Sequence, residues 1–407
     1  MVEESRRPIE TAPGFGLLTK ESLLAVNKKG GRLFIGIPKE KTFQENRVSI
    51  TPEAVSLLVN NGHHVVIESK AAEGSSYFDT DYSEAGAEIA DDAKSVFAAD
   101  IIIKSAPLAI HEISMMHMNQ VIISPIHLPM VNEKYLQELM NKKITALAFE
   151  YIKDNSNTFP IVRSMSEIAG NASILIAAEY LSNLNQGKGI LLGGIAGVPP
   201  ANVVILGAGV VGQFAARTAL GLGAIIKVFD NSIYKLMRLQ NNLGTRVFTS
   251  VISPTTLMDK LEDADVAIGA IHSETGRAPV VVTEEMVSNM KAGSVIIDVS
   301  IDQGGCFETS EVTTHTKPVF KKYDVIHYCV PNIASRVPRT ASSAISNVIT
   351  PLLLEAASFG GFDKFLIENV NLRHGVYIYK GSLTNRNLSQ MFGLKFTDLD
   401  LIFASSI

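Results

Sequence analysis

At 407 residues with a formal net charge of −5, the chain is longer than a single hydrophobic core usually organises, so we expect two domains. It has no long basic run that could follow a nucleic-acid backbone or an anionic membrane, which argues against both as partners. Two cysteines, Cys306 and Cys329, are too few for a disulfide framework and favour a reducing, cytoplasmic location.

The N-terminal part of the chain predicts an extension followed by an α/β domain. Residues 1–32 lack a continuous apolar run and a signal-cleavage pattern, so we interpret them as a flexible extension. From residue 33 on, short β-rich runs alternate with amphipathic segments, a pattern typical of a doubly wound sheet. Helices are expected to start near Thr51, Asp91 and Asn132. The predicted strands are 33–37, 64–69, 100–105, 121–126 and 144–149.

A helix predicted over residues 164–184 should lead into a second domain, and one over about 340–357 should return to the first. The fold class we predict is α/β, with two doubly wound Rossmann-like domains and a cleft between them. The first domain is discontinuous, 33–160 plus 340–407, and surrounds a nucleotide domain of 161–339. The strands predicted in the second domain are 203–206, 225–229, 246–249, 265–270, 294–299 and 325–329.

Residues 203–231 form the most informative segment, because they combine the parts of a dinucleotide-binding βαβ unit. The strand 203–206 ends in the loop Gly207-Ala208-Gly209-Val210-Val211-Gly212, after which apolar residues recur at helical spacing. Gly207 permits the tight turn, Gly209 lets the backbone approach a pyrophosphate, and Gly212 lets helix and strand pack closely. The helix N-terminus would offer unpaired N–H groups to phosphate.

The next strand, 225–229, ends at Asp230. Its carboxylate can accept hydrogen bonds from both ribose hydroxyls and would repel a 2′-phosphate, so we predict NAD rather than NADP. Glycines between a helix and a strand often serve packing alone. The coincidence with an acidic strand end favours the cofactor interpretation.

Polar residues beyond the carboxyl ends of strands are candidates for catalysis in such sheets. His127 follows the strand 121–126 directly and could transfer protons near neutral pH; a capping or core histidine is the alternative. Asp302, beyond the strand 294–299, could activate a water beside the nicotinamide. A turn-forming aspartate before Gly304-Gly305 is the alternative there.

Two cations are candidates for binding the substrate. Arg47 offers a planar fork to a carboxylate, and Lys104 offers a point charge to a carboxylate or carbonyl oxygen; an ordinary surface charge is the alternative for each. The chain contains neither CxxC, HExxH nor GxSxG. We therefore predict no metal site and no hydrolase.

Together these residues resemble the alanine dehydrogenases and the related N-terminal region of the NAD(P) transhydrogenase alpha subunit. The similarity covers about residues 34–359. Besides the glycine-rich loop, it is carried by the segments Gly36-Ile37-Pro38-Lys39-Glu40, Glu45-Asn46-Arg47-Val48, Glu84-Ala85-Gly86-Ala87-Glu88-Ile89, Met165-Ser166-Glu167-Ile168-Ala169-Gly170, Gly193-Gly194-Ile195-Ala196-Gly197-Val198, Ile301-Asp302-Gln303-Gly304-Gly305-Cys306-Phe307-Glu308 and Tyr328-Cys329-Val330-Pro331-Asn332.

The resemblance implies an NAD-dependent oxidoreductase of amino-acid metabolism that reversibly deaminates L-alanine to pyruvate and ammonia, as a homo-oligomer and commonly a hexamer. Hydride would pass from the alanine Cα to nicotinamide C4. By resemblance, Arg47 holds the substrate carboxylate, His127 bonds the pyruvate oxygen and shuttles protons, and Asp302 activates water or ammonia. Ser166 and Asn332 would line the nicotinamide side, and Asp230 would bind the adenosine ribose.

One departure from the family pattern affects the substrate site. The pattern Lys-x-Lys-Glu-Pro is replaced by Lys104-Ser105-Ala106-Pro107, so Ala106 stands where a substrate lysine is expected. We predict that Lys104 reaches the substrate from one pleat away. The departure leaves two alternatives: a transhydrogenase-like or other 2-amino-acid dehydrogenase, and an NAD-binding protein without turnover.

Overall fold

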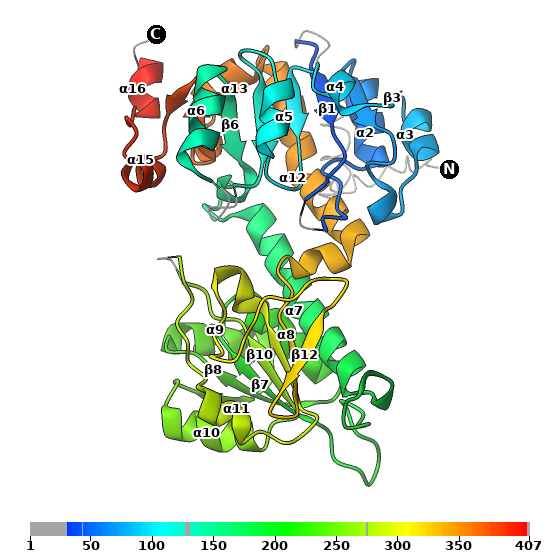
Figure 1. Ribbon diagram of the computed structural model, residues 1–407, viewed down its shortest axis with the longest axis vertical. Coiled ribbons are helices and arrows are strands. Elements are labelled where there is room, and N and C mark those ends of the chain that lie inside the picture. The colour runs from blue at the N-terminus through cyan, green and yellow to red at the C-terminus, as the bar shows by residue number, and fades with distance from the viewer. Residues whose placement is uncertain (1–30, 43, 127–130, 274–275, 405–407) are drawn as a thin grey trace, which may run out of the picture.

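The computed structural model describes residues 31–42, 44–126, 131–273 and 276–404, which form two lobes (Figure 1). Each lobe is built on a mainly parallel sheet with helices packed on it. This confirms the predicted fold class. The extension predicted over residues 1–32 lies, up to residue 30, outside the described residues.

The sheet of the first lobe has the strand order β15-β14-β6-β5-β4-β1-β2-β3. Strands β1 to β6 pair in parallel, whereas β14 runs antiparallel to β6. Since β14 and β15 follow the second lobe in sequence, the first lobe is discontinuous, as predicted. The five predicted strands are confirmed, and β3, β14 and β15 were missed. The bounds are β1 (Phe34–Ile37), β2 (His64–Glu68), β3 (Glu88–Ala90), β4 (Ile101–Ile103), β5 (Val121–Ser124), β6 (Thr145–Ala148), β14 (Val376–Tyr379) and β15 (Ser382–Leu383).

Three helices of the first lobe begin at the polar residues that the sequence predicts. Asp92 and Asn132 accept hydrogen bonds from the backbone N–H three residues on, and Thr51 precedes a proline, so all three predicted helix starts are confirmed. The helices are α2 (Pro52–Asn60), α3 (Asp79–Glu84), α4 (Ala93–Val96), α5 (Ile110–Met115), α6 (Glu133–Asn141), α13 (Phe362–Glu368), α14 (Val370–Arg373), α15 (Arg386–Phe392) and α16 (Leu399–Ala404).

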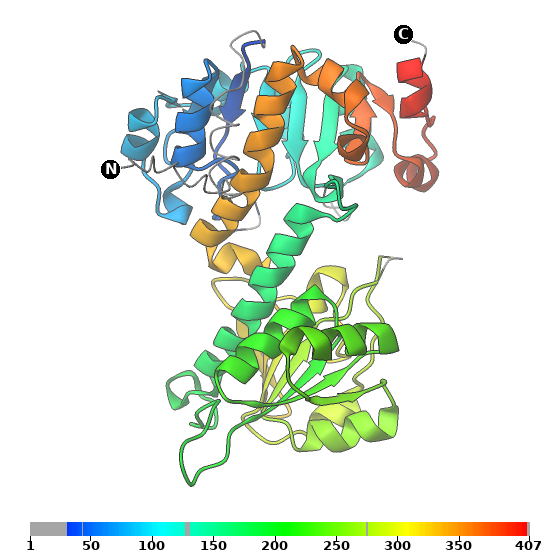
Figure 2. The same cartoon turned by 180° about the vertical axis from the view of Figure 1, so that it is seen from behind.

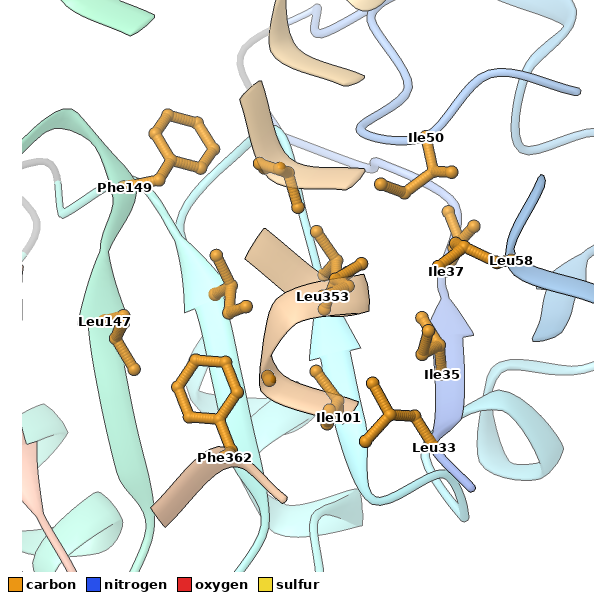
Figure 3. Close-up of a cluster of buried hydrophobic side chains, with 14 of the residues drawn as sticks. Leu33, Ile35, Ile37, Ile50, Leu58, Ile101, Leu147, Phe149, Leu353 and Phe362 are labelled. Atoms are coloured by element: carbon orange, nitrogen blue, oxygen red, sulfur yellow. The ribbon is translucent and has the colours of Figure 1, made fainter. Parts of the chain in front are cut away.

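Two long helices meet at the junction of the lobes: α7 (Pro160–Leu181) runs from the first lobe into the second, and α12 (Pro338–Ser358) starts beside it and runs along the first lobe (Figure 2). They correspond to the helices predicted over 164–184 and 340–357. The apolar face of α12 packs on the first sheet, where Leu353 lies among the side chains of Ile35 and Ile101 (Figure 3). Within the described ranges no single helix meets the length and hydropathy of a membrane span; only α12 and α13 taken together do, with a 100° bend between them.

The sheet of the second lobe has the order β12-β13-β11-β10-β7-β8-β9, and its six predicted strands are confirmed; β12 was missed. The chain moves from β7 outward to β9 and then returns to the other side at β10. The strand order therefore reverses beside β7, which is where open α/β sheets bind ligands. The bounds are β7 (Asn202–Leu206), β8 (Ile225–Phe229), β9 (Phe248–Ser250), β10 (Val266–Gly269), β11 (Val295–Asp298), β12 (Val319–Lys322), β13 (Val325–Tyr328), α8 (Val210–Gly221), α9 (Ile233–Leu243), α10 (Pro254–Glu262) and α11 (Glu284–Ser288).

Candidate active site

The glycine-rich loop forms the turn between β7 and α8, at the point where the strand order reverses. Gly207 has φ +110°, and a Cβ there would lie 2.3 Å from the carbonyl oxygen of Ala270. A Cβ at Gly212 would lie 1.8 Å from the carbonyl oxygen of Gly207, whereas a Cβ at Gly209 would meet no atom within 4 Å. Gly207 and Gly212 are therefore required for the turn itself. Gly209 leaves open space in front of the helix N-terminus.

Asp230 lies beside this turn, directly after β8. Its carboxylate accepts hydrogen bonds from the N–H groups of Ala208 and Ser232, both at 2.7 Å. It therefore holds the loop in shape as well as presenting an acidic group near it. Lys235 and Arg238 of α9, which the sequence analysis missed, line the adjoining cavity. The signal that could have found them is two basic residues in the helix after the acidic strand end.

Two cavities meet between the lobes. The first, of about 520 Å³, extends from Gly209, Val210 and Val211 of the loop to Ser166 of α7. The second, of about 650 Å³, is lined by Ser105 and Ala106 of the first lobe and by residues of the second. Three residues line both cavities: Arg47, Asp302 and Asn332. Residues more than 250 positions apart in sequence thus converge at one place.

Asp302 lies in the 3₁₀ turn Val299–Gln303 after β11. Its Oδ1 accepts a hydrogen bond from the backbone N–H of Asn332 at 3.1 Å. Burial raises the pKa of Asp302, and the Asn332 bond and the charge of Arg47 offset this only in part. The carboxyl group can therefore exchange a proton closer to neutral pH than an exposed aspartate.

The turn that carries Asp302 is held by Asp298, a residue that the sequence analysis did not single out. The buried Asp298 carboxylate accepts hydrogen bonds from the backbone N–H groups of Ser300 (3.0 Å) and Cys306 (2.9 Å) and from the hydroxyl of Ser310 (2.7 Å). These bonds close the loop on both sides of Asp302. No sequence signal separates Asp298 from an ordinary strand-end aspartate.

The guanidinium of Arg47 is paired with Glu45. Arg47 Nε lies 2.7 Å from Glu45 Oε1, and Nη2 lies 2.5 Å from Oε2. Burial opposes ionisation of Glu45, but the charge and hydrogen bonds of Arg47 outweigh it and lower the pKa of that carboxyl. Glu45 was also missed, although it stands two residues before the candidate arginine.

Lys104 is buried away from both cavities. Its Nζ donates to Glu40 Oε2 at 2.7 Å and to Glu112 Oε1 at 3.0 Å, and the side chain is 1% exposed. Burial alone would lower the pKa of Lys104, but the two carboxylates raise it. The charge is already neutralised within the first lobe. This placement gives no support to the prediction that Lys104 reaches the substrate, because its ammonium points to these carboxylates and not into the cleft.

His127 lies outside the described residues, so its catalytic role stays a prediction. The preceding residue, Ile126, donates its N–H to Glu150 Oε1 at 2.7 Å. Glu150 lines the first cavity, its buried Oε2 has no hydrogen-bond partner among the described residues, and burial raises its pKa to about 8. Sequence gave no reason to select Glu150. In the described part of the chain, no three His, Cys, Asp or Glu side chains are grouped to hold a metal ion.

Known proteins match the chain over nearly its whole length. The family models "Alanine dehydrogenase/PNT, N-terminal domain" and "Alanine dehydrogenase/PNT, C-terminal domain" match residues 36–169 and 173–386. Alanine dehydrogenase 2 of Staphylococcus aureus is 39% identical over 367 residues, which are 90% of this chain and 98% of that protein.

Solved structures of the same two kinds of protein have folds similar to that of this chain. An L-alanine dehydrogenase superposes with a TM-score of 0.83 at 37% identity, covering 88% of this chain and 99% of that one. A transhydrogenase from Sinorhizobium meliloti has a TM-score of 0.74 at 25% identity, covering 87% of this chain and 99% of its own.

Gly209 and Gly212 of the loop should respond differently to replacement by alanine. Gly209→Ala is expected to fold normally and to bind NADH about tenfold more weakly, because its methyl group would enter the open space before α8. Gly212→Ala should instead lower the melting temperature, since its Cβ would overlap the Gly207 carbonyl. Fluorescence titration and thermal denaturation measure the two effects. Unchanged NADH affinity in Gly209→Ala would contradict this assignment.

Glu150 should make stability depend on pH. The native protein keeps this proton up to about pH 8, whereas the unfolded chain releases it near 4.5, so the native state binds more protons between these values. The free energy of unfolding therefore falls as pH rises through that range. Glu150→Gln should flatten the fall in urea denaturation at about pH 5, 7 and 9. The exposed Glu284→Gln serves as control, and parallel curves for Glu150→Gln and wild type would refute the assignment.

Proposed function

The chain belongs to the alanine dehydrogenase/PNT family, and from that premise we propose that it is an alanine dehydrogenase, converting L-alanine, NAD and water reversibly to pyruvate, ammonia and NADH. The observation that carries the proposal is the meeting of Arg47 and Asp302, from opposite lobes, where the second cavity joins the one that begins at the glycine-rich loop. An amino acid held there lies next to the place for a nicotinamide.

The family implies a nicotinamide cofactor, and we propose NAD in particular. The open space at Gly209 and the N-terminus of α8 suit a pyrophosphate. Asp230 favours a free 2′-hydroxyl over a phosphate. Ser166 and Asn332 would line the nicotinamide end. When bound, the cofactor supplies the hydride acceptor at C4.

In this proposal the protein contributes position and proton transfer. Arg47 binds the alanine carboxylate and thereby orients the Cα–H bond. The Cα loses hydride and the amine loses a proton, which leaves an imine. Asp302 accepts a proton from the water that attacks this imine and returns it to the nitrogen, which gives a carbinolamine. The hydroxyl proton then passes to the nitrogen as the C=O bond forms, the C–N bond breaks and ammonia leaves. Burial raises the pKa of Asp302 above that of an exposed aspartate, which makes its carboxylate a stronger base toward the attacking water. His127 is the proposed hydrogen-bond donor to the pyruvate oxygen.

The remaining assignments are proposals with separate support. The strand composition of the sheets supports a substrate domain of 33–160 plus 340–407 around an NAD domain of 161–339. The two cysteines are free and buried, which supports a cytoplasmic location. Apolar side chains after α7 stand exposed and support a homo-oligomer, by family resemblance a hexamer: Leu184, Leu191, Ile195 and Val198.

A second function is favoured by Ala106 and by the neutralised Lys104. Of the described residues that line the second cavity, Arg47 alone offers a cation to the substrate carboxylate, so the two-cation site of the family pattern is incomplete and hydride exchange between nucleotides or oxidation of another 2-amino acid is the alternative. The similarity to the Sinorhizobium meliloti transhydrogenase also supports hydride exchange between nucleotides.

Turnover separates these functions. Wild-type protein is expected to produce NADH from NAD with L-alanine, followed by absorbance, and to use NADP far less well. Asp302→Asn should lower kcat at least about 100-fold while NADH binding stays intact. Asp400→Asn, the same change at an exposed aspartate that lines neither cavity, serves as the control and should keep the wild-type kcat.

Activity only with another amino acid or with a second nucleotide would replace the main proposal, and wild-type kcat in Asp302→Asn would remove Asp302 from the mechanism.

The proposed oligomer depends on the exposed apolar segment after α7. Ile195→Asp is expected to reduce the mass measured by light scattering, because a charge there would be buried at the interface. Leu401→Asp places the same charge at an exposed apolar residue far from that segment in the sequence, and it should leave the mass unchanged. A monomeric wild-type protein would contradict the proposal.

A further inference from the structure

Glu45 receives hydrogen bonds from both sides of the cleft. Within the first lobe it binds Arg47 through Nε and Nη2. From the segment after β13 it accepts a bond from Asn332 Nδ2 at 2.8 Å and one from the Ser335 hydroxyl at 3.1 Å. Its side chain is 2% exposed. A carboxylate so enclosed has one orientation and keeps its charge.

This pairing decides which edge of the Arg47 guanidinium a ligand can use. Glu45 occupies the Nε/Nη2 edge, so the end formed by Nη1 and Nη2 remains. In the part of the chain that the structure describes, the one hydrogen-bond partner of Nη1 is the sulfur of Met165, a weak acceptor, at 3.3 Å. Among the described residues that line the second cavity, Arg47 is the sole arginine or lysine. A substrate carboxylate must therefore bind at that end of the guanidinium, beside the negative charge of Glu45.

Asn332 extends the same network to the second candidate residue. Its side chain donates to Glu45, and its backbone N–H donates to Asp302 Oδ1. Asn332 has φ +57°, a left-handed conformation that asparagine tolerates well and that lets one residue make both contacts. A chain of hydrogen bonds therefore leads from Arg47 to Glu45, from Glu45 to Asn332, and from Asn332 to Asp302. The position of the cation is thus linked to the position of the acid group.

We propose that Glu45 is a positioning residue that fixes Arg47 for one carboxylate in one orientation, and that it does so at the expense of substrate affinity. The proposal rests on the function proposed above and deepens it. Glu45 repels the incoming carboxylate, so its charge weakens binding. It also prevents Arg47 from turning to meet that carboxylate elsewhere, which keeps the Cα facing the nicotinamide. The substrate class that fits is a 2-amino acid with a single carboxylate, since Glu45 and Asp302 would both repel a second.

Glu45→Gln tests this with two readouts. The variant should bind pyruvate at least about tenfold more tightly and have a kcat about tenfold lower, because the freed cation attracts the carboxylate but no longer aligns it. Thermal denaturation with NADH and increasing pyruvate measures affinity without turnover, and a larger rise in melting temperature than in wild type is expected. Reductive amination kinetics measure kcat.

Two further variants complete the test. Glu45→Asp keeps the charge on a shorter side chain, so it should retain near wild-type pyruvate affinity with a reduced kcat. It also serves if Glu45→Gln does not fold. Glu284→Gln is the control. It removes a largely solvent-accessible carboxylate that pairs with Lys322, and it should match wild type in both measurements.

The outcomes distinguish this inference from the proposed function. Weaker pyruvate binding in Glu45→Gln, or wild-type kcat in Glu45→Asp, would show an ordinary structural ion pair and overturn the inference while the dehydrogenase function stands. Tighter pyruvate binding in a protein without alanine turnover would support the role of Glu45 and refute the function. No pyruvate-dependent change in any variant would overturn both.

Discussion

A buried charge without a partner costs several kcal/mol, and the first lobe satisfies that constraint, in the cleft and behind it, before any ligand arrives. Arg47 is compensated by Glu45, and Lys104 by Glu40 and Glu112. Each ion pair fixes the direction of its side chain. The shape of the site thus follows from the need to pair these charges.

Glu150 is a buried carboxyl group that avoids an unpaired charge in a different way. Within the described part of the chain Glu150 Oε2 has no hydrogen-bond partner, and its carboxyl group is accommodated by holding a proton rather than by an ion pair. Asp302 lies between the two cases: it has one backbone donor and a nearby cation, and its pKa is still raised. Such intermediate compensation is what a group that exchanges protons requires.

The sequence predicted the parallel strands because they are buried on both faces, which leaves an uninterrupted apolar run such as Ile101-Ile102-Ile103. It missed β15, with two residues, because so short a strand carries no periodicity. It missed β14 because pairing with β6 depends on contacts more than 200 residues away. In the candidate site, strand-end position was enough to select Arg47 and Asp302. Their partners Glu45 and Asn332 act through hydrogen bonds that only the folded chain creates, which spacing does not encode.

The return of the chain to its first lobe has a consequence for the order of synthesis. Strand β14 completes the first sheet beside β6, and α12 covers one of its faces, yet both are translated after the whole second lobe. On the ribosome the nucleotide-binding half can close its own core while the other half still exposes an unpaired strand edge and a bare apolar surface. The chain from Pro338 on is therefore what covers the aggregation-prone edge and face of the nascent first lobe.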